Sequence, residues 1–118
     1  MKSYEELLAK AKEWREWYYD GDPGTPEVAK STEEAFDLIN ATLFGHIYQR
    51  PTLEPKIRSL CTIAALIVLD KPNQLPGHIT GALNYGWSKE EIVELITQML
   101  FYGGYPTCLL YTSDAADE

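Results

Sequence analysis

Residues 61–69 read CTIAALIVL, an apolar run that only Thr62 interrupts. The run is about half of the roughly 20 apolar residues that a membrane-spanning helix needs. A helix that is apolar on nearly every side belongs at the centre of a helical bundle or in a subunit interface. We therefore predict a central helix over residues 53–69 that holds much of the core.

The segments on both sides of this run also carry helical patterns. Further helices are predicted over residues 4–19, from residue 32 to about 45, and over residues 74–85 and 89–102. In the last of these, Ile92, Leu95, Ile96 and Met99 recur at helical spacing on one face. Sustained alternation of the kind that marks strands is not found. The predicted fold is an all-α, antiparallel bundle of five to six helices.

Short polar motifs mark where the predicted helices begin. The Ser-x-x-Glu pattern occurs three times, at Ser3 with Glu6, Ser31 with Glu34 and Ser88 with Glu91. In such a capping box the serine oxygen accepts from a backbone N–H while the glutamate reaches back to the serine N–H. Thr52 is the predicted N-cap of the central helix, with Pro55 in its first turn, where a missing N–H costs nothing.

Length and charge exclude several classes of protein. The chain has 118 residues, with 10 Lys and Arg against 18 Asp and Glu, and a formal net charge of −8. An acidic balance argues against binding to nucleic acid, which needs clustered Lys and Arg. The N-terminus lacks the pattern of a signal peptide. We expect a cytoplasmic protein with neither a nucleic-acid nor a membrane partner.

The last eleven residues have a separate origin in this interpretation. Residues 108–118 read CLLYTSDAADE and resemble the in-frame translation of a transposase-type sequencing adapter. The native part is then a single domain over residues 1–107, in which a sixth helix predicted at Pro106 is truncated. Without the three acidic residues of this tail the balance is 10 against 15, or −5, and Cys61 is the one native thiol.

Two blocks of sequence carry further motifs. The first reads FGHIYQRP over residues 44–51, continues with Leu53, and reads RSLCTIA over residues 58–64. The second reads LPGHITGALNYG over residues 75–86, SKEEI over residues 88–92 and YGGYP over residues 102–106. In this order and spacing the blocks resemble the pattern of the carboxymuconolactone decarboxylase family. The resemblance covers about residues 35–106.

This resemblance implies a fold and a reaction. The fold would be that of alkylhydroperoxidase D-like proteins. The reaction would convert a carboxymuconolactone to an enol-lactone with loss of CO2 and without a cofactor, as a step in the catabolism of aromatic compounds. The protein would be a homotrimer or a homohexamer, and the apolar central helix agrees with burial between subunits.

His78 is the predicted catalytic residue. It lies one helical turn from Leu75 and Ala82, so it faces the apolar side of its helix. A histidine of ordinary pKa can move a proton near neutral pH, and decarboxylation must deliver a proton to carbon. His78 also falls on the histidine of the family motif, which implies a role as general acid and base.

Two of the three arginines are the predicted holders of the substrate carboxylate. Arg50 and Arg58 both lie in the motif blocks, and a guanidinium can hold a carboxylate through two hydrogen bonds. A salt bridge at a helix end or between subunits is the structural alternative for each of them. Arg15 lies on the charged first helix, where we expect it to be solvated.

Three further residues are candidates for the substrate pocket. His46 occupies a variable position of the first block, Tyr48 stands where the family pattern has Trp, and Tyr102 matches the Tyr of the pattern. His46 would line the pocket, and either tyrosine could donate a hydrogen bond to substrate, although both tyrosines also suit a packing role. Thr52 stands where decarboxylases commonly have Gly. The two histidines, 32 positions apart, do not make a metal-ligand set, so no metal is predicted.

Two other functions stay open. Alkylhydroperoxidase D-like proteins work through a C-x-x-C pair, but residues 61–64 read CTIA and lack the second thiol. A redox protein that uses Cys61 with an external thiol is the first alternative, although a thiol in an apolar run is usually buried and unreactive. The second alternative is a non-catalytic, oligomeric relative that binds a small ligand.

Overall fold

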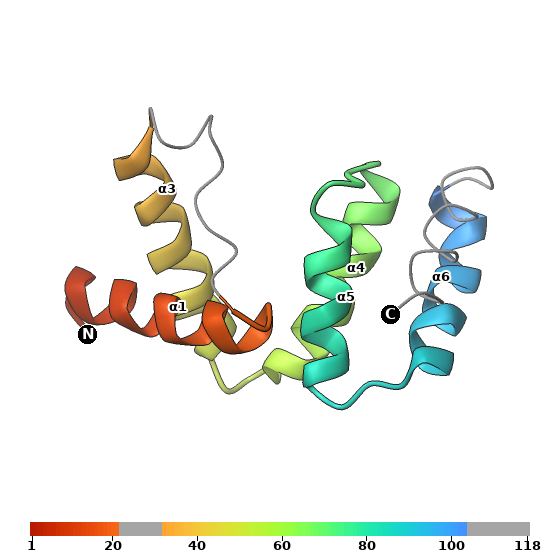
Figure 1. Ribbon diagram of the computed structural model, residues 1–118, viewed down its shortest axis with the longest axis horizontal. Helices are drawn as coiled ribbons and strands as arrows, with labels where there is room; N and C mark the ends of the chain where they lie inside the picture. Colours follow the sequence, from red (N-terminus) through yellow and green to blue (C-terminus); the bar gives the residue numbers. More distant parts are fainter. Residues whose placement is uncertain (22–31, 104–118) are drawn as a thin grey trace. The chain divides into compact units, whose positions relative to one another are not determined.

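The computed structural model describes residues 1–21 and 32–103 (Figure 1). These residues form helices and turns, and none of them lies in a strand, which confirms the predicted fold class. None of the described helices is both long and apolar enough to cross a membrane. The chain divides into two compact units, Met1–Pro55 and Lys56–Glu118.

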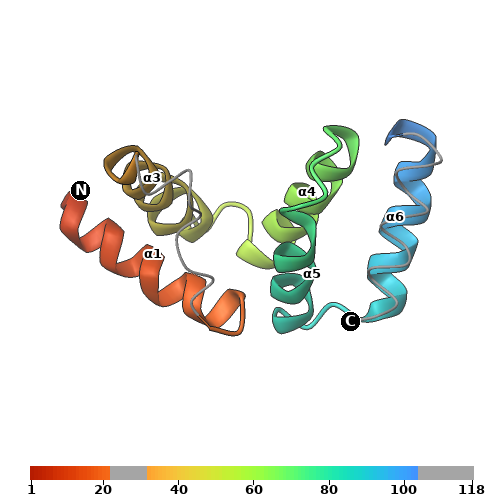
Figure 2. The same ribbon diagram turned by 45° about the horizontal axis from the view of Figure 1, so that its top comes forward.

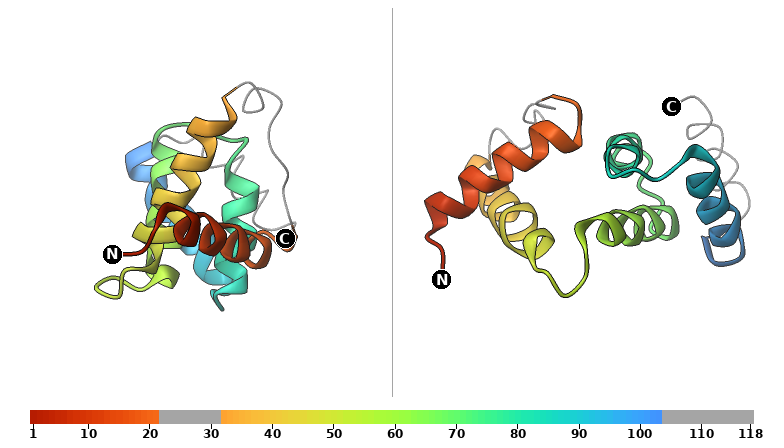
Figure 3. Two further views of the ribbon diagram at one scale, coloured as in Figure 1. Left: turned by 90° about the vertical axis from the view of Figure 1, so that its left-hand side faces the viewer. Right: turned by 90° about the horizontal axis from the view of Figure 1, so that it is seen from below.

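The first unit consists of two helical segments that cross. Helix α1 spans Tyr4–Tyr18, and α3 spans Glu33–Asn40. Helix α3 continues without a break into a π-helical segment, η1 (Ala41–His46), and a short 3-10 turn, η2 (Ile47–Gln49). Figure 1 and the right-hand view of Figure 3 show α1 lying across this continuous helix. The helix therefore extends past residue 45, where the sequence pattern predicted its end.

Aromatic side chains hold this crossing together. The Trp14 ring stacks on Tyr18 at 4.2 Å between centroids and on Phe44 at 4.8 Å. The Tyr48 ring makes a T-shaped contact with the Trp14 ring at 5.0 Å between centroids. All four of these residues are buried. Offset and edge-on aromatic pairs of this kind add about 0.5–1.5 kcal/mol each to the gain from burial. This aromatic cluster fixes η1 against α1.

The second unit contains the predicted central helix. Helices α4 (Pro55–Val68), α5 (Leu75–Asn84) and α6 (Lys89–Gly103) follow one another in alternating directions (Figure 2). Their shared core is made of aliphatic side chains, including Ile63, Ile67, Leu75, Ile79, Ile92 and Ile96. The apolar run of residues 61–69 contributes Ile63, Leu66 and Ile67 to this core, as its pattern predicted.

The connection between α5 and α6 is closed by two hydrogen-bonded motifs. Gly86 has a φ of 98°, and its N–H donates to Leu83 O at 2.9 Å while Trp87 N–H donates to Ala82 O at 3.1 Å. This pair of bonds is a Schellman motif, which needs the left-handed backbone that glycine adopts at low cost. Ser88 and Glu91 then form the predicted reciprocal box, with bonds of 2.9 and 3.0 Å.

One predicted helix start is wrong, and the predicted capping box at Ser31 is not described by the structure. Helix α4 begins at Pro55, so Thr52 lies outside it and does not cap it. Helix α3 takes Thr32 as its N-cap, without a side-chain capping bond, and Ser31 lies outside the described residues. The predicted sixth helix and residues 108–118 also lie outside them. The box at Ser3 is confirmed, because Glu6 N–H donates to Ser3 Oγ at 3.2 Å.

Candidate functional site

His78 lies in the middle of α5 and is 6% exposed, as its apolar helix face predicted. Its neighbours on the same helix, Leu75, Ile79 and Ala82, are fully buried in the core of the second unit. Burial disfavours the charged imidazolium and lowers the pKa of His78 to about 4. The imidazole is therefore neutral at pH 7.

Arg58 lies on α4, in the same unit as His78, and is partly buried. Its carbonyl oxygen accepts a hydrogen bond from Thr62 Oγ1 at 3.0 Å, and the adjacent Ser59 Oγ donates to Lys56 O at 2.6 Å. These side-chain bonds to the helix backbone hold the first turns of α4. Trp87 Nε1 donates to Lys56 O at 2.9 Å, which ties the start of α6 to the same turn.

Cys61 departs from its predicted environment. The sequence predicted a buried, unreactive thiol, but Cys61 is an exposed free cysteine on the outer side of α4. The buried residues of helix α4 are Ser59, Ile63, Leu66 and Ile67. Position 61 does not share the helix face of these residues and is exposed. The helical register, rather than the mean polarity of the run, decides the exposure of this thiol.

The remaining candidates separate between the units. His46 and Arg50 are exposed at the end of η1 and just after η2 in the first unit. Tyr48 is 3% exposed, and its ring packs within the aromatic cluster. Tyr102 is 73% exposed at the end of α6 in the second unit. Arg58, His78 and Tyr102 thus lie on three different helices of the second unit, and the other three lie in the first unit.

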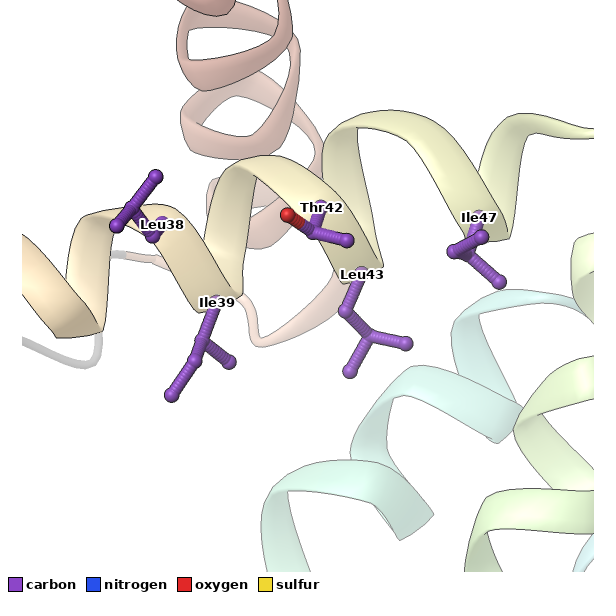
Figure 4. Close-up of a pocket in the computed structure, with 5 residues that line it drawn as sticks. All are labelled: Leu38, Ile39, Thr42, Leu43 and Ile47. Atoms are coloured by element: carbon purple, nitrogen blue, oxygen red, sulfur yellow. The ribbon is translucent and has the colours of Figure 1, made fainter.

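Two hollows lie in the first unit. One, of about 330 Å³, is shallow and lined by Leu38, Ile39, Thr42, Leu43 and Ile47. Figure 4 shows Ile39 and Leu43 projecting from one side of the helix. These side chains lack an ionisable group, so this hollow offers no catalytic chemistry by itself. The second hollow, of about 220 Å³, lies between α1 and α3 and is lined in part by Arg15 and Asn40.

Sequence reasoning missed the surroundings of Arg15. Its guanidinium carbon lies 5.4 Å from the centroid of the Phe36 ring and 5.9 Å from that of Tyr19. Burial raises the pKa of Tyr19 to about 12, against the opposing charge of Arg15. The one signal in the sequence is the spacing of Arg15 and Tyr19, which places them on one helix face. Phe36 comes from another helix and could not be paired with them in advance.

The described residues define an all-helical protein that keeps a neutral histidine in the core of three helices. Among them, no group of three His, Cys, Asp or Glu side chains is placed to hold a metal ion. The sequence profile of the carboxymuconolactone decarboxylase family matches residues 33–118. The chain belongs to this family.

Individual relatives agree with this assignment. The chain is 36% identical over 90 residues to the 4-carboxymuconolactone decarboxylase of Acinetobacter baylyi. This match covers 70% of this chain and 67% of that protein. It is 35% identical over 78 residues to a nitrosuccinic acid decarboxylase of Metarhizium robertsii, covering 66% and 54%. It is 36% identical over 74 residues to peroxisomal protein 2 of Schizosaccharomyces pombe, covering 58% and 35%.

These relatives indicate the type of reaction in the family but do not agree on one substrate. Two of the three are named as decarboxylases, so the family is decarboxylase-like. Their names give different acids, a carboxymuconolactone and a nitrosuccinic acid. The matched part of the chain spans between about a third and two thirds of the lengths of these three proteins. The names of the relatives therefore do not identify the substrate of this chain, which depends on its own site residues.

Proposed function

We propose that this protein is a cofactor-independent decarboxylase that acts on a small carboxylated lactone, or a related acid, in the catabolism of aromatic compounds. The observation that carries the proposal is the buried His78 in α5, on the histidine of the family motif. Decarboxylation must deliver a proton to carbon, and histidine is the side chain that most often transfers protons in enzymes.

The proton balance assigns a sequence of events to His78. When the carboxylate leaves as CO2, the electron pair of the broken C–C bond stays on the substrate and spreads toward the lactone carbonyl. A proton must then bond to carbon. Neutral His78 has no acidic proton to give at pH 7, because burial lowers its pKa to about 4. An anionic substrate beside it favours the imidazolium, so the bound complex takes up the proton that His78 delivers.

The arginines have a complementary role in this proposal. Arg58, on the helix before His78, is partly buried, and a guanidinium that is partly removed from water binds a carboxylate more strongly than an exposed one. Arg50, His46 and Tyr48 belong to the first unit, and Tyr102 ends α6. We propose Arg50 as a second holder of the carboxylate and the other three residues as further contacts of the substrate.

We also propose that the protein works as a homotrimer or homohexamer. The face of α3 and η1 formed by Leu38, Ile39 and Leu43 is 37–60% exposed, and continuous apolar faces of this kind mark interaction surfaces. Light scattering after size-exclusion chromatography measures the assembly. The substitution Ile39→Glu should dissociate it, and the exposed Thr42→Ala is the matched control on the same turn.

A panel of acids tests the proposed reaction. The full chain is incubated with 4-carboxymuconolactone, nitrosuccinic acid and unsubstituted muconolactone, and released CO2 is measured. The proposal expects CO2 from at least one carboxylated lactone or acid and none from the muconolactone control, which lacks the leaving carboxylate. Absence of CO2 from every acid, in protein shown to be folded and oligomeric, favours the non-catalytic ligand-binding relative.

The exposed Cys61 supports one competing function. Its thiolate could attack a peroxide, break the O–O bond and form a sulfenic acid with release of water or an alcohol. An external thiol would then have to reduce the sulfenic acid, because residues 61–64 contain no second cysteine. Consumption of peroxide that depends on both Cys61 and added thiol would favour this redox function over decarboxylation.

A further inference from the structure

The hollow between α1 and α3 contains a buried donor without an acceptor. Arg15 Nε is shielded from solvent, and it makes no hydrogen bond in the structure. A buried donor left in this state costs about 1–3 kcal/mol, and native proteins fill such positions with an ordered water, an ion or a ligand. The hollow of about 220 Å³ beside Arg15 is large enough for a small organic molecule.

The lining of the hollow combines apolar surface with positively charged and polar groups. Leu8 and Phe36 provide apolar surface, and the Phe36 ring lies under the Arg15 guanidinium at 5.4 Å. Lys12 adds a second positive charge from α1. Asn40, which is 6% exposed, adds an amide whose Nδ2 donates to Phe36 O at 2.9 Å and is thereby held in place. A cationic end beside an aromatic wall suits a ligand with one anionic group and an apolar body.

Two acidic side chains restrict the charge of that ligand. Glu16 and Asp37 also line the hollow, so the formal charges of the lining cancel. A phosphate dianion would face both carboxylates and is disfavoured by like-charge repulsion. A monocarboxylate can place its single charge on the guanidinium, with its ring against Phe36.

We propose that this hollow is a binding site for a small aromatic or unsaturated monocarboxylate, held by Arg15 Nε–H. The site uses α1 and α3 of the first unit alone and shares no residue with the proposed decarboxylation chemistry of His78 and Arg58. The buried Nε of Arg15 corrects the expectation that this side chain is merely solvated. The ligand would stabilise the crossing of α1 and α3, because it binds only where the two helices meet.

Benzoate is the probe for this site. Equilibrium dialysis gives its affinity for the full chain, and the NMR signal of the Arg15 Nε–H, assigned by its loss in Arg15→Lys, reports where it binds. We expect this signal to shift on addition of benzoate. Benzamide, which has the same shape without the charge, and acetate, which lacks the ring, should each bind at least about tenfold more weakly than benzoate.

Substitutions on α1 and α3 complete the test. Arg15→Gln should weaken benzoate binding at least about tenfold, whereas Lys10→Gln, which removes a charge from α1 outside the hollow, should change it less than about twofold. If Arg15→Gln fails to fold by circular dichroism, Asp37→Asn gives an independent readout and should tighten binding about two- to fivefold. Benzamide binding as tightly as benzoate, or an Arg15 signal that does not move, would overturn the proposal.

The same measurements separate this site from the proposed reaction. His78→Gln should abolish CO2 release and leave the benzoate-induced shift of the Arg15 Nε–H unchanged. A shift that disappears in His78→Gln contradicts the monocarboxylate site, because the probe is then acting through the second unit. Absence of CO2 release in the parent chain, with the shift retained, contradicts only the proposed decarboxylation.

Discussion

The backbone of Gly45 in η1 packs directly against the backbone of Leu7 in α1. A Cβ at position 45 would lie 2.9 Å from the Leu7 carbonyl carbon and nearer still to its oxygen. The two helices of the first unit therefore approach one another at a point that only glycine permits. The aromatic cluster of Trp14 and Phe44 lies on the same pair of segments. Glycine at this position sets the distance across which those rings stack.

Gly45→Ala should destabilise the first unit by about 1–3 kcal/mol, because backbone atoms cannot move aside as a side chain can. The direction of the change in stability is informative, because a Gly to Ala substitution inside a helix without such a contact stabilises the protein by about 0.5–1 kcal/mol. Urea unfolding measures the change. Thr42→Ala, at an exposed position of the same segment, is the control and should stay within about 0.5 kcal/mol. A stabilised Gly45→Ala variant would show that the close approach is absent.

The π-helical segment illustrates what the sequence could and could not reveal. Capping boxes and apolar spacing located α1, α5 and α6 to within a residue or two, because both signals act within one or two turns. Through Ala41–His46 the continuation of α3 packs against α1, and that contact joins residues far apart in the chain. Thr52 failed as a cap because Pro55, with its fixed φ, is itself suited to the first helical position.

His78 should make stability depend on pH. In the unfolded chain the imidazole, with a pKa of 6.5, takes up a proton below about pH 6.5, whereas in the folded state it does so only below about pH 4. The unfolded state therefore binds more protons in this window, and stability falls as the pH is lowered through it, by up to about 3 kcal/mol. Urea unfolding between pH 7 and 4.5 measures the slope.

The matched variants for this slope are His78→Gln and His46→Gln. His78→Gln should flatten the pH dependence, whatever its effect on stability at pH 7. His46 is exposed at the end of η1, and His46→Gln should leave the slope in place. Parallel slopes for the parent chain and His78→Gln would mean that His78 is not buried as the fold of the second unit requires.

Gly86 should be required for the turn between α5 and α6. Its φ of 98° is outside the range that L-residues prefer, so Gly86→Ala should cost about 1–2 kcal/mol in the free energy of unfolding. Gly86→Asn should cost less, because asparagine tolerates left-handed backbone better than alanine does. Thermal or urea unfolding compares the two. Equal losses for both variants would indicate a steric cause instead of a backbone one.

Cys61 should react with a thiol reagent in the folded protein, because it is exposed on α4. The measurement uses a Cys108→Ser background, so that one thiol is counted by mass after labelling without denaturant. Cys61→Ser in the same background is the control and should take no label. If Cys61 labels only in denaturant, either the side chain is covered by another subunit or the register of α4 is wrong.

The sequence predicted the local environment of some single site residues, but not the pairings between segments that surround them. The position of His78 on the apolar face of its helix follows from Leu75 and Ala82 one turn away, and its burial is confirmed. Exposure of Cys61 could not be predicted from an apolar run, because every side of that helix looks alike until its partners are known. The hollow at Arg15 needed Phe36 from a second helix. Pairings between distant segments are the part that local patterns do not contain.

The pH profile of kcat/KM for the best acid of the panel tests the central claim, that His78 supplies the proton. The free protein holds His78 neutral above about pH 4, so the protonated fraction should fall with rising pH. The account predicts a kcat/KM that declines about tenfold per pH unit from pH 5.5 to 8, and a His78→Gln variant at least about 10²-fold slower in kcat. A His78→Gln variant with the parent's kcat and the parent's pH profile would contradict it.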